Sequence, residues 1–68
     1  MSLLASEAFH FWVLSSATRK AEQAGQMDCA LAAEIVDEVE VLAMHTDSQK
    51  LRYYCERLIA RCRRAMAA

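Results

Sequence analysis

The chain contains one glycine and no proline among its 68 residues, and this scarcity limits what it can fold into. Reverse turns and β-hairpins depend on these two residue types, because glycine adopts backbone conformations closed to other residues and proline pre-sets a turn. Helix interiors exclude both. Good helix formers such as alanine, leucine, glutamate and arginine fill much of the chain. We therefore predict an all-α fold in a single helical domain spanning residues 1–68.

Hydrophobic periodicity and helix-end signals predict three helices, at about residues 3–24, 29–45 and 49–66. Gly25 stands where a residue in the left-handed conformation would end the first helix. Asp28 stands where its carboxylate can cap the second helix. Three residues are alternative caps for the third helix: Thr46, Asp47 and Ser48. Because the connections are short, we expect a small antiparallel bundle of the three helices.

The second and third helices carry apolar stripes at helical spacing. In the third helix the stripe comprises Leu51, Cys55, Leu58, Cys62 and Ala65. In the second helix it is centred on Leu31, Ile35, Val39 and Leu42, and it is wider than the ~100° that faces one neighbour. We therefore expect the second helix to lie centrally and to contact both of the others.

The first helix has apolar residues on two sides of its N-terminal half. One stripe is expected to face the core, and it comprises Leu3, His10, Val13, Leu14, Ala17, Ala21 and Ala24. A second surface comprises Leu4, Ala8, Phe11 and Trp12, and Phe9 lies between the two. One intramolecular core cannot use both sides of a helix. Since an exposed apolar patch on a soluble protein marks an interaction site, we interpret the second surface as a binding surface.

Self-association would explain the high hydrophobic content. Hydrophobic residues make up 56% of the chain, against ~45–50% in typical globular domains. A chain this short buries only about 60% of the surface that its unfolded form exposes. The net charge of -1 does not oppose association. We therefore expect dimerisation to complete the bundle.

Charge is segregated along the chain. Residues 26–48 carry six carboxylates and no Lys or Arg, whereas residues 49–68 carry six basic residues and one carboxylate. In one interpretation, the second and third helices pair through these complementary flanks, each exposed pair contributing ~0–1 kcal/mol. In another, a basic stripe meets an acidic protein surface or a nucleic acid; its members are Lys50, Arg57, Arg61 and Arg64. The acidic second helix is the main objection to nucleic acid.

The cysteines and the N-terminal segment indicate the compartment. Cys29, Cys55 and Cys62 are odd in number and form no CxxC pair, which argues against a secreted disulfide framework. We interpret them as reduced, buried thiols that pack as small hydrophobic side chains. No Lys or Arg precedes Arg19, unlike a signal peptide, and no run of about 18 apolar residues could cross a membrane. We expect a cytoplasmic protein with no membrane partner.

The sequence holds no nucleophile motif, glycine-rich phosphate loop, paired-carboxylate pocket or closely spaced metal ligands, so we expect no enzymatic activity, cofactor or metal. We predict a homodimeric protein-interaction module: a helical adaptor, chaperone or inhibitor that binds a larger protein. Tyr53 lies among the arginines, either as a binding residue or packed under their stems. The expected contact residues are Leu4, Ala8, Phe9, Phe11, Trp12, Tyr53, Arg57, Arg61 and Arg64. The alternative is a nucleic-acid-binding regulator that uses Lys50, Arg57, Arg61 and Arg64.

Overall fold

Three helices make up the described part of the computed structural model, which covers the backbone of residues 2–67 and the side chains of residues 6–67. They are α1 (Ser2–Gln23), α2 (Cys29–His45) and α3 (Gln49–Ala67). No strand occurs within residues 2–67. The all-α prediction is confirmed, and every helix end lies within one residue of its expected position. None of the helices in this part of the chain has the length and apolarity needed to cross a membrane.

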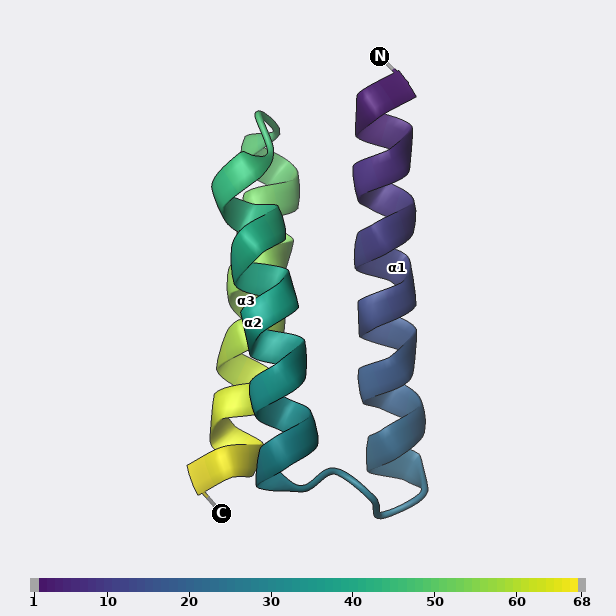
Figure 1. Cartoon of the computed structure of the whole chain (residues 1–68), viewed down its shortest axis with the longest axis vertical. Coiled ribbons are helices and arrows are strands. Elements are labelled where there is room, and N and C mark those ends of the chain that lie inside the picture. Colours follow the sequence, from purple (N-terminus) through teal and green to yellow (C-terminus); the bar gives the residue numbers. More distant parts are fainter. Residues whose placement is uncertain (1, 68) are drawn as a thin grey trace.

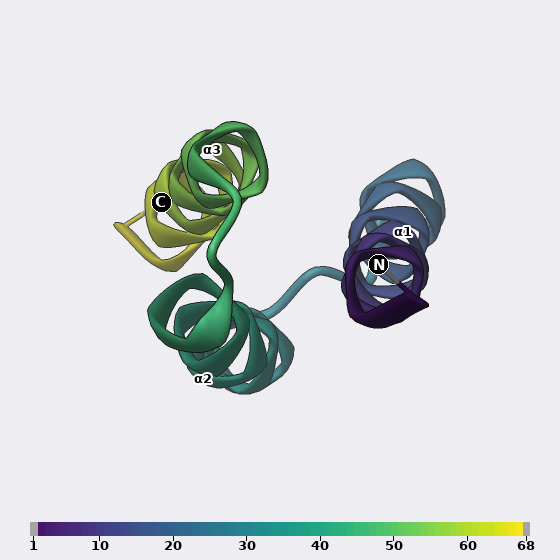
Figure 2. The ribbon, with the colours of Figure 1, turned by 90° about the horizontal axis from the view of Figure 1, so that it is seen from above.

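The three helices lie unequally close to one another. In Figure 1 the chain descends along α1, ascends along α2 and descends again along α3. Seen from above, α2 and α3 lie side by side and α1 stands apart from both (Figure 2). Contacts between α2 and α3 accordingly far outnumber those that α1 makes with either. The fold is therefore a closely packed α2–α3 hairpin against which α1 rests.

Local capping contacts explain where the helices begin and end. Gly25 has a φ of 68°, and the amide of Gln26 donates to the carbonyl of Ala21 at 2.8 Å, as in a Schellman motif. Asp28 accepts a 2.8 Å hydrogen bond from the amide of Leu31 and caps α2. Of the three candidate caps for α3, Ser48 takes the role, because its hydroxyl accepts from the amide of Leu51 at 3.1 Å.

The core lies mainly between α2 and α3, where the expected apolar stripes meet. Its buried members on α2 are Ala32, Ile35, Val36, Val39 and Leu42. On α3 they are Leu51, Cys55, Leu58, Ile59 and Cys62. From α1, Leu14 joins this cluster. The stripes predicted for these two helices are thus largely confirmed, and α2 contacts both of its neighbours as expected.

The inward side of α1 differs from the expected one. The residues facing the hairpin are Glu7, Phe11, Leu14, Thr18 and Ala21. Four residues that were expected to face the core are exposed: His10, Val13, Ala17 and Ala24. The side chain of Leu3 lies outside the described residues. Thr18 is fully buried, because its hydroxyl donates to the carbonyl of Leu14 at 2.9 Å and so needs no partner outside its own helix. The expectation for α1 was therefore wrong by part of a helical turn.

The α2–α3 connection ties the N-terminal half of α1 to the hairpin. Thr46 is buried, and its hydroxyl donates to Oε1 of Glu7 at 2.7 Å. The same hydroxyl accepts from the amide of Ser48 at 3.1 Å. Arg52 braces the connection by donating to the carbonyls of Ala43 and Thr46 at 3.2 and 2.7 Å. Glu7 thus anchors α1 to a connection in which the Thr46 hydroxyl and carbonyl are both hydrogen-bonded.

Candidate functional site

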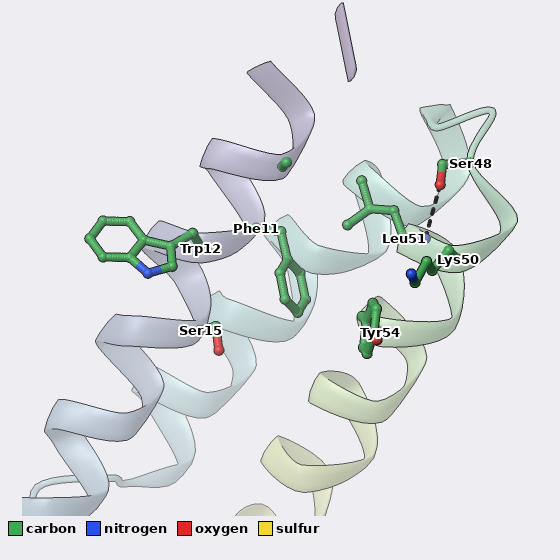
Figure 3. A pocket seen from close by; sticks show the side chains of 8 residues that line it. Phe11, Trp12, Ser15, Ser48, Lys50, Leu51 and Tyr54 are labelled. Carbon is green, nitrogen blue, oxygen red and sulfur yellow. Dashed lines mark hydrogen bonds between the residues drawn. The ribbon is translucent and has the colours of Figure 1, made fainter. Parts of the chain in front are cut away.

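An apolar hollow of about 460 Å³ lies between the N-terminal halves of α1 and α3. Its main lining residues, here called the apolar end, are Ala8, Phe11 and Trp12 of α1 with Leu51 and Tyr54 of α3. Figure 3 shows Phe11 pointing from α1 toward Leu51 and Tyr54, whereas Trp12 points outward. Polar groups contribute little to the lining, which includes Ser15, Ser48 and Lys50. The hollow therefore offers an apolar floor to an apolar ligand surface.

Aromatic contacts shape the apolar end. The rings of Phe11 and Tyr54 lie 6.3 Å apart across the hollow and are tilted by 42°. Trp12 stacks on Phe9, with ring centroids 6.1 Å apart. Yet Trp12 and Phe9 remain 60% and 65% exposed. Large apolar side chains left this exposed mark a surface on which another molecule can gain burial.

The hollow continues toward the C-terminal half of α3 and becomes basic. A second hollow of about 270 Å³ shares Phe11, Ser15 and Tyr54 with the first. Its charged lining residues, here called the basic end, are Arg57, Arg61 and Arg64. From Leu51 to Arg64, α3 spans about 20 Å at 1.5 Å per residue. We call the two hollows together the groove: apolar at one end and cationic at the other.

Two of the three arginines at the basic end have partners within the chain. Arg61 donates to both carboxylate oxygens of Glu22 on α1, at 2.5 and 3.1 Å. This hydrogen-bonded pair lowers the pKa of Glu22 and raises that of Arg61. Arg57 lies over the Tyr53 ring at 5.7 Å and donates to its hydroxyl at 3.0 Å, which raises the pKa of Arg57.

The internal ion pairs use only part of the segregated charge. Arg63 of α3 pairs with Glu40 of α2 at 2.8 Å, as complementary flanks predict. Arg61, however, reaches α1 rather than α2. The exposed His10 has Nε2 3.5 Å from Glu38, an ion pair only when the imidazole is protonated. Exposed carboxylates therefore remain on α2, and exposed cations remain on α3.

The cysteines divide into two groups. Cys55 and Cys62 are buried in the core, as expected, and burial raises the pKa of each thiol. The Thr18 hydroxyl beside Cys62 partly opposes that rise. Cys29 is exposed, contrary to expectation. It is the first residue of α2, and its thiol donates to the carbonyl of Met66 at 3.5 Å.

The structure brings most of the predicted contact residues to the groove. These are Ala8, Phe11, Trp12, Arg57, Arg61 and Arg64. Phe9 and Tyr53 are exposed beside it; Phe9 stacks on Trp12, and Tyr53 meets the Tyr54 ring edge to face. The side chain of Leu4 lies outside the described residues. The sequence did not identify Leu51 and Tyr54 as groove residues. Its pattern placed them on or beside the apolar stripe of α3, and the pattern does not show that this side of α3 also borders α1.

Comparisons with protein-family models, with curated proteins and with solved structures find no significant match to this chain. The functional argument therefore depends on the groove and on the charges around it.

Proposed function

We propose that this protein is a non-enzymatic protein-interaction module that works as a homodimer in the cytoplasm and binds a larger protein as an adaptor, chaperone or inhibitor. The architecture that goes with this proposal is an antiparallel three-helix bundle completed by a second copy. The contact residues are those of the groove together with Phe9 and Tyr53.

One observation carries the proposal: the groove has an apolar end, yet Trp12 at that end stays mostly exposed. The folded chain exposes 4731 Å², whereas a compact monomer of 7.7 kDa exposes about 4,330 Å². The excess of about 400 Å² is half of what each partner contributes to a standard protein–protein interface, about 800 Å². Association through the groove would remove such an excess.

The arginines of α3 support a protein partner more than a nucleic acid. Arg61 is engaged with Glu22, and the acidic α2 packs directly against α3. Phosphate groups docked on α3 would therefore lie near several carboxylates and meet a reduced set of free cations. Tryptophan, tyrosine and arginine, the residue types most enriched in binding hot spots, all occur around the groove.

Light scattering coupled to size-exclusion chromatography tests the proposal. We expect the mass to rise from monomer to dimer with concentration, and Trp12→Ala to weaken this association while circular dichroism shows unchanged helicity. Met66→Ala is the matched control, because Met66 is exposed and apolar but lies outside the groove. A wild-type mass that stays monomeric at every concentration would refute the homodimer. Binding to duplex DNA at low salt that is lost with Arg57 and Arg64 would favour the nucleic-acid alternative.

A further inference from the structure

One side of α2 carries a stripe of five exposed residues: Ala30, Glu34, Asp37, Val41 and Met44. Asp37 and Val41 of this stripe also border α1, where they line a hollow of about 260 Å³ with His10. Their spacing, alternating four and three residues, is typical of a helix face directed at neighbouring helices. The acidic pair, Glu34 and Asp37, is followed by the apolar pair, Val41 and Met44. The apolar pair is 54% and 75% exposed. We call these five residues the outer stripe.

The groove presents complementary chemistry in the opposite order. Along α3 the groove is mainly apolar first, at Leu51 and Tyr54 with the exposed Lys50 beside them, and basic afterwards, at Arg57 and Arg64. Along α2 the outer stripe is acidic first and apolar afterwards. A helix with this stripe, laid into the groove and running opposite to α3, would therefore meet apolar groups with apolar groups and cations with carboxylates.

The distances along the two helices agree. The centres of the acidic pair and the apolar pair are seven residues apart, or about 10 Å along α2. The centre of Leu51 and Tyr54 lies eight residues from the centre of Arg57 and Arg64, or about 12 Å along α3. Both pairs can thus engage at once without stretching either helix.

We propose that the groove of one copy receives the outer stripe of α2 from a second copy. This inference rests on the proposed self-association and names the surface that occupies the groove. In Figure 1 α1 and α3 run in one direction and α2 in the other. The incoming α2 runs opposite to both walls of the groove, as the fourth helix of an up-down-up-down bundle does.

Charge distinguishes this occupant from a second copy of α1. The two carboxylates of α1 in the described residues are engaged, Glu7 with Thr46 and Glu22 with Arg61. An incoming α1 would bring Arg19 and Lys20 toward a groove whose charged lining is entirely cationic. The acidic pair of α2 instead supplies carboxylates to the basic end, so association through α2 weakens as ionic strength rises.

The contact joins two different surfaces, the groove of one copy and the outer stripe of the other. Such a heterologous contact leaves one groove and one outer stripe open in every pair. In isolation the open groove takes further copies, so the wild-type mass should pass beyond the dimer at high concentration, whereas in the proposed homodimer a helix of similar charge pattern on the larger protein takes the open groove. Self-association and binding of the larger protein would therefore use the same contacts, an apolar surface and carboxylates laid into the groove.

Two variants, each lacking one half of the contact, test the proposal. The groove variant is Trp12→Lys, and the stripe variant combines Val41→Lys with Met44→Lys. All three side chains are mostly exposed, so both variants keep the fold, which circular dichroism checks. Alone, each variant should remain a 7.7 kDa monomer under conditions in which the wild type associates. Mixed in equal amounts, they should form a pair of about 15.4 kDa, twice the chain mass.

Fluorescence gives an independent reading, because Trp12 is the only tryptophan. The stripe variant keeps Trp12 and the groove variant has none, so tryptophan emission from the mixture comes only from the groove of the stripe variant. We expect the emission maximum to shift to shorter wavelength as the groove variant is added. A titrant carrying all three substitutions is the matched control and should cause no shift.

Three results would overturn the proposal. One is a stripe variant that self-associates as the wild type does. It would mean that another surface of the chain occupies the groove, and it would not contradict the proposed interaction module. The second is a mixture that remains monomeric. The third is a wild-type chain that is monomeric at every concentration, which would refute the homodimer as well.

Discussion

Truncation of Leu14 tests how α1 rests on the hairpin. Leu14 is 7% exposed and joins the core cluster, whereas the adjacent Val13 is 40% exposed. Leu14→Ala removes three carbon groups at about 0.8 kcal/mol each, so about 2 kcal/mol of burial free energy is lost. The cavity adds little, because α1 packs more loosely than the other helices and can settle toward the hairpin. We expect a total loss of about 2–3 kcal/mol.

Val13→Ala is the matched control for this prediction. It removes two carbon groups that are about 60% buried, which costs about 1 kcal/mol. Alanine recovers up to about 0.7 kcal/mol through its higher helix propensity. We therefore expect a net change within about 0.5 kcal/mol, although the sequence pattern alone places both residues on one inward stripe.

The assay is urea unfolding at low protein concentration, followed by circular dichroism and by Trp12 fluorescence. Because a core of this size supplies only about 3–5 kcal/mol, Leu14→Ala should lose at least about 40% of the stability. The reasoning fails if Val13→Ala costs as much as Leu14→Ala, or if Leu14→Ala costs less than about 1 kcal/mol. Either result would mean that α1 presents a different side to the hairpin.

Two further predictions concern ionisable groups. Glu22→Gln should reduce the free energy of unfolding by about 0–1 kcal/mol at neutral pH, because the ion pair is partly exposed. Folding lowers the pKa of Glu22, so this stabilisation is present above the ordinary carboxyl pKa and is lost as pH falls through the folded-state value; urea titrations of both proteins should converge in acid. Brief alkylation of the reduced native chain should modify Cys29 and spare Cys55 and Cys62, whose burial raises their thiol pKa, whereas denaturant should expose all three to mass-spectrometric detection.

Helix positions were predictable because local signals determine them. Gly25 and Asp28 act within one turn of their own positions, and the structure confirms both roles. The buried sides of α2 and α3 were predictable for the same reason, because the apolar stripe of each helix is wide or regular enough to identify the side that faces the core. These features require no knowledge of which residues are neighbours in space.

The orientation of α1 was not predictable from the pattern of apolar residues. Thr18 counts as polar in such a pattern, yet a hydrogen bond to the carbonyl of Leu14 lets it lie fully buried. Glu7 counts as a solvent residue, yet it bonds to Thr46, 39 positions away. The two polar residues turn α1 so that Phe11 faces the hairpin. The groove depends on this rotation of α1 about its axis. The sequence therefore indicated that α1 carries a binding surface, but it did not indicate that Leu51 and Tyr54 of α3 complete it.

Docking of α1 and occupation of the groove are thermodynamically linked, because α1 forms one wall of the groove. A ligand that binds only the folded chain adds about 2.7 kcal/mol of stability at one hundred times its dissociation constant. That is close to the loss expected for Leu14→Ala, although Leu14 does not line the groove. If a second copy occupies the groove, raising the protein concentration should therefore raise the urea midpoint of Leu14→Ala, and adding the stripe substitutions should abolish this dependence. The exposed aromatic surface and the loose packing of α1 would then have one cause: both are completed only when a second copy binds in the groove.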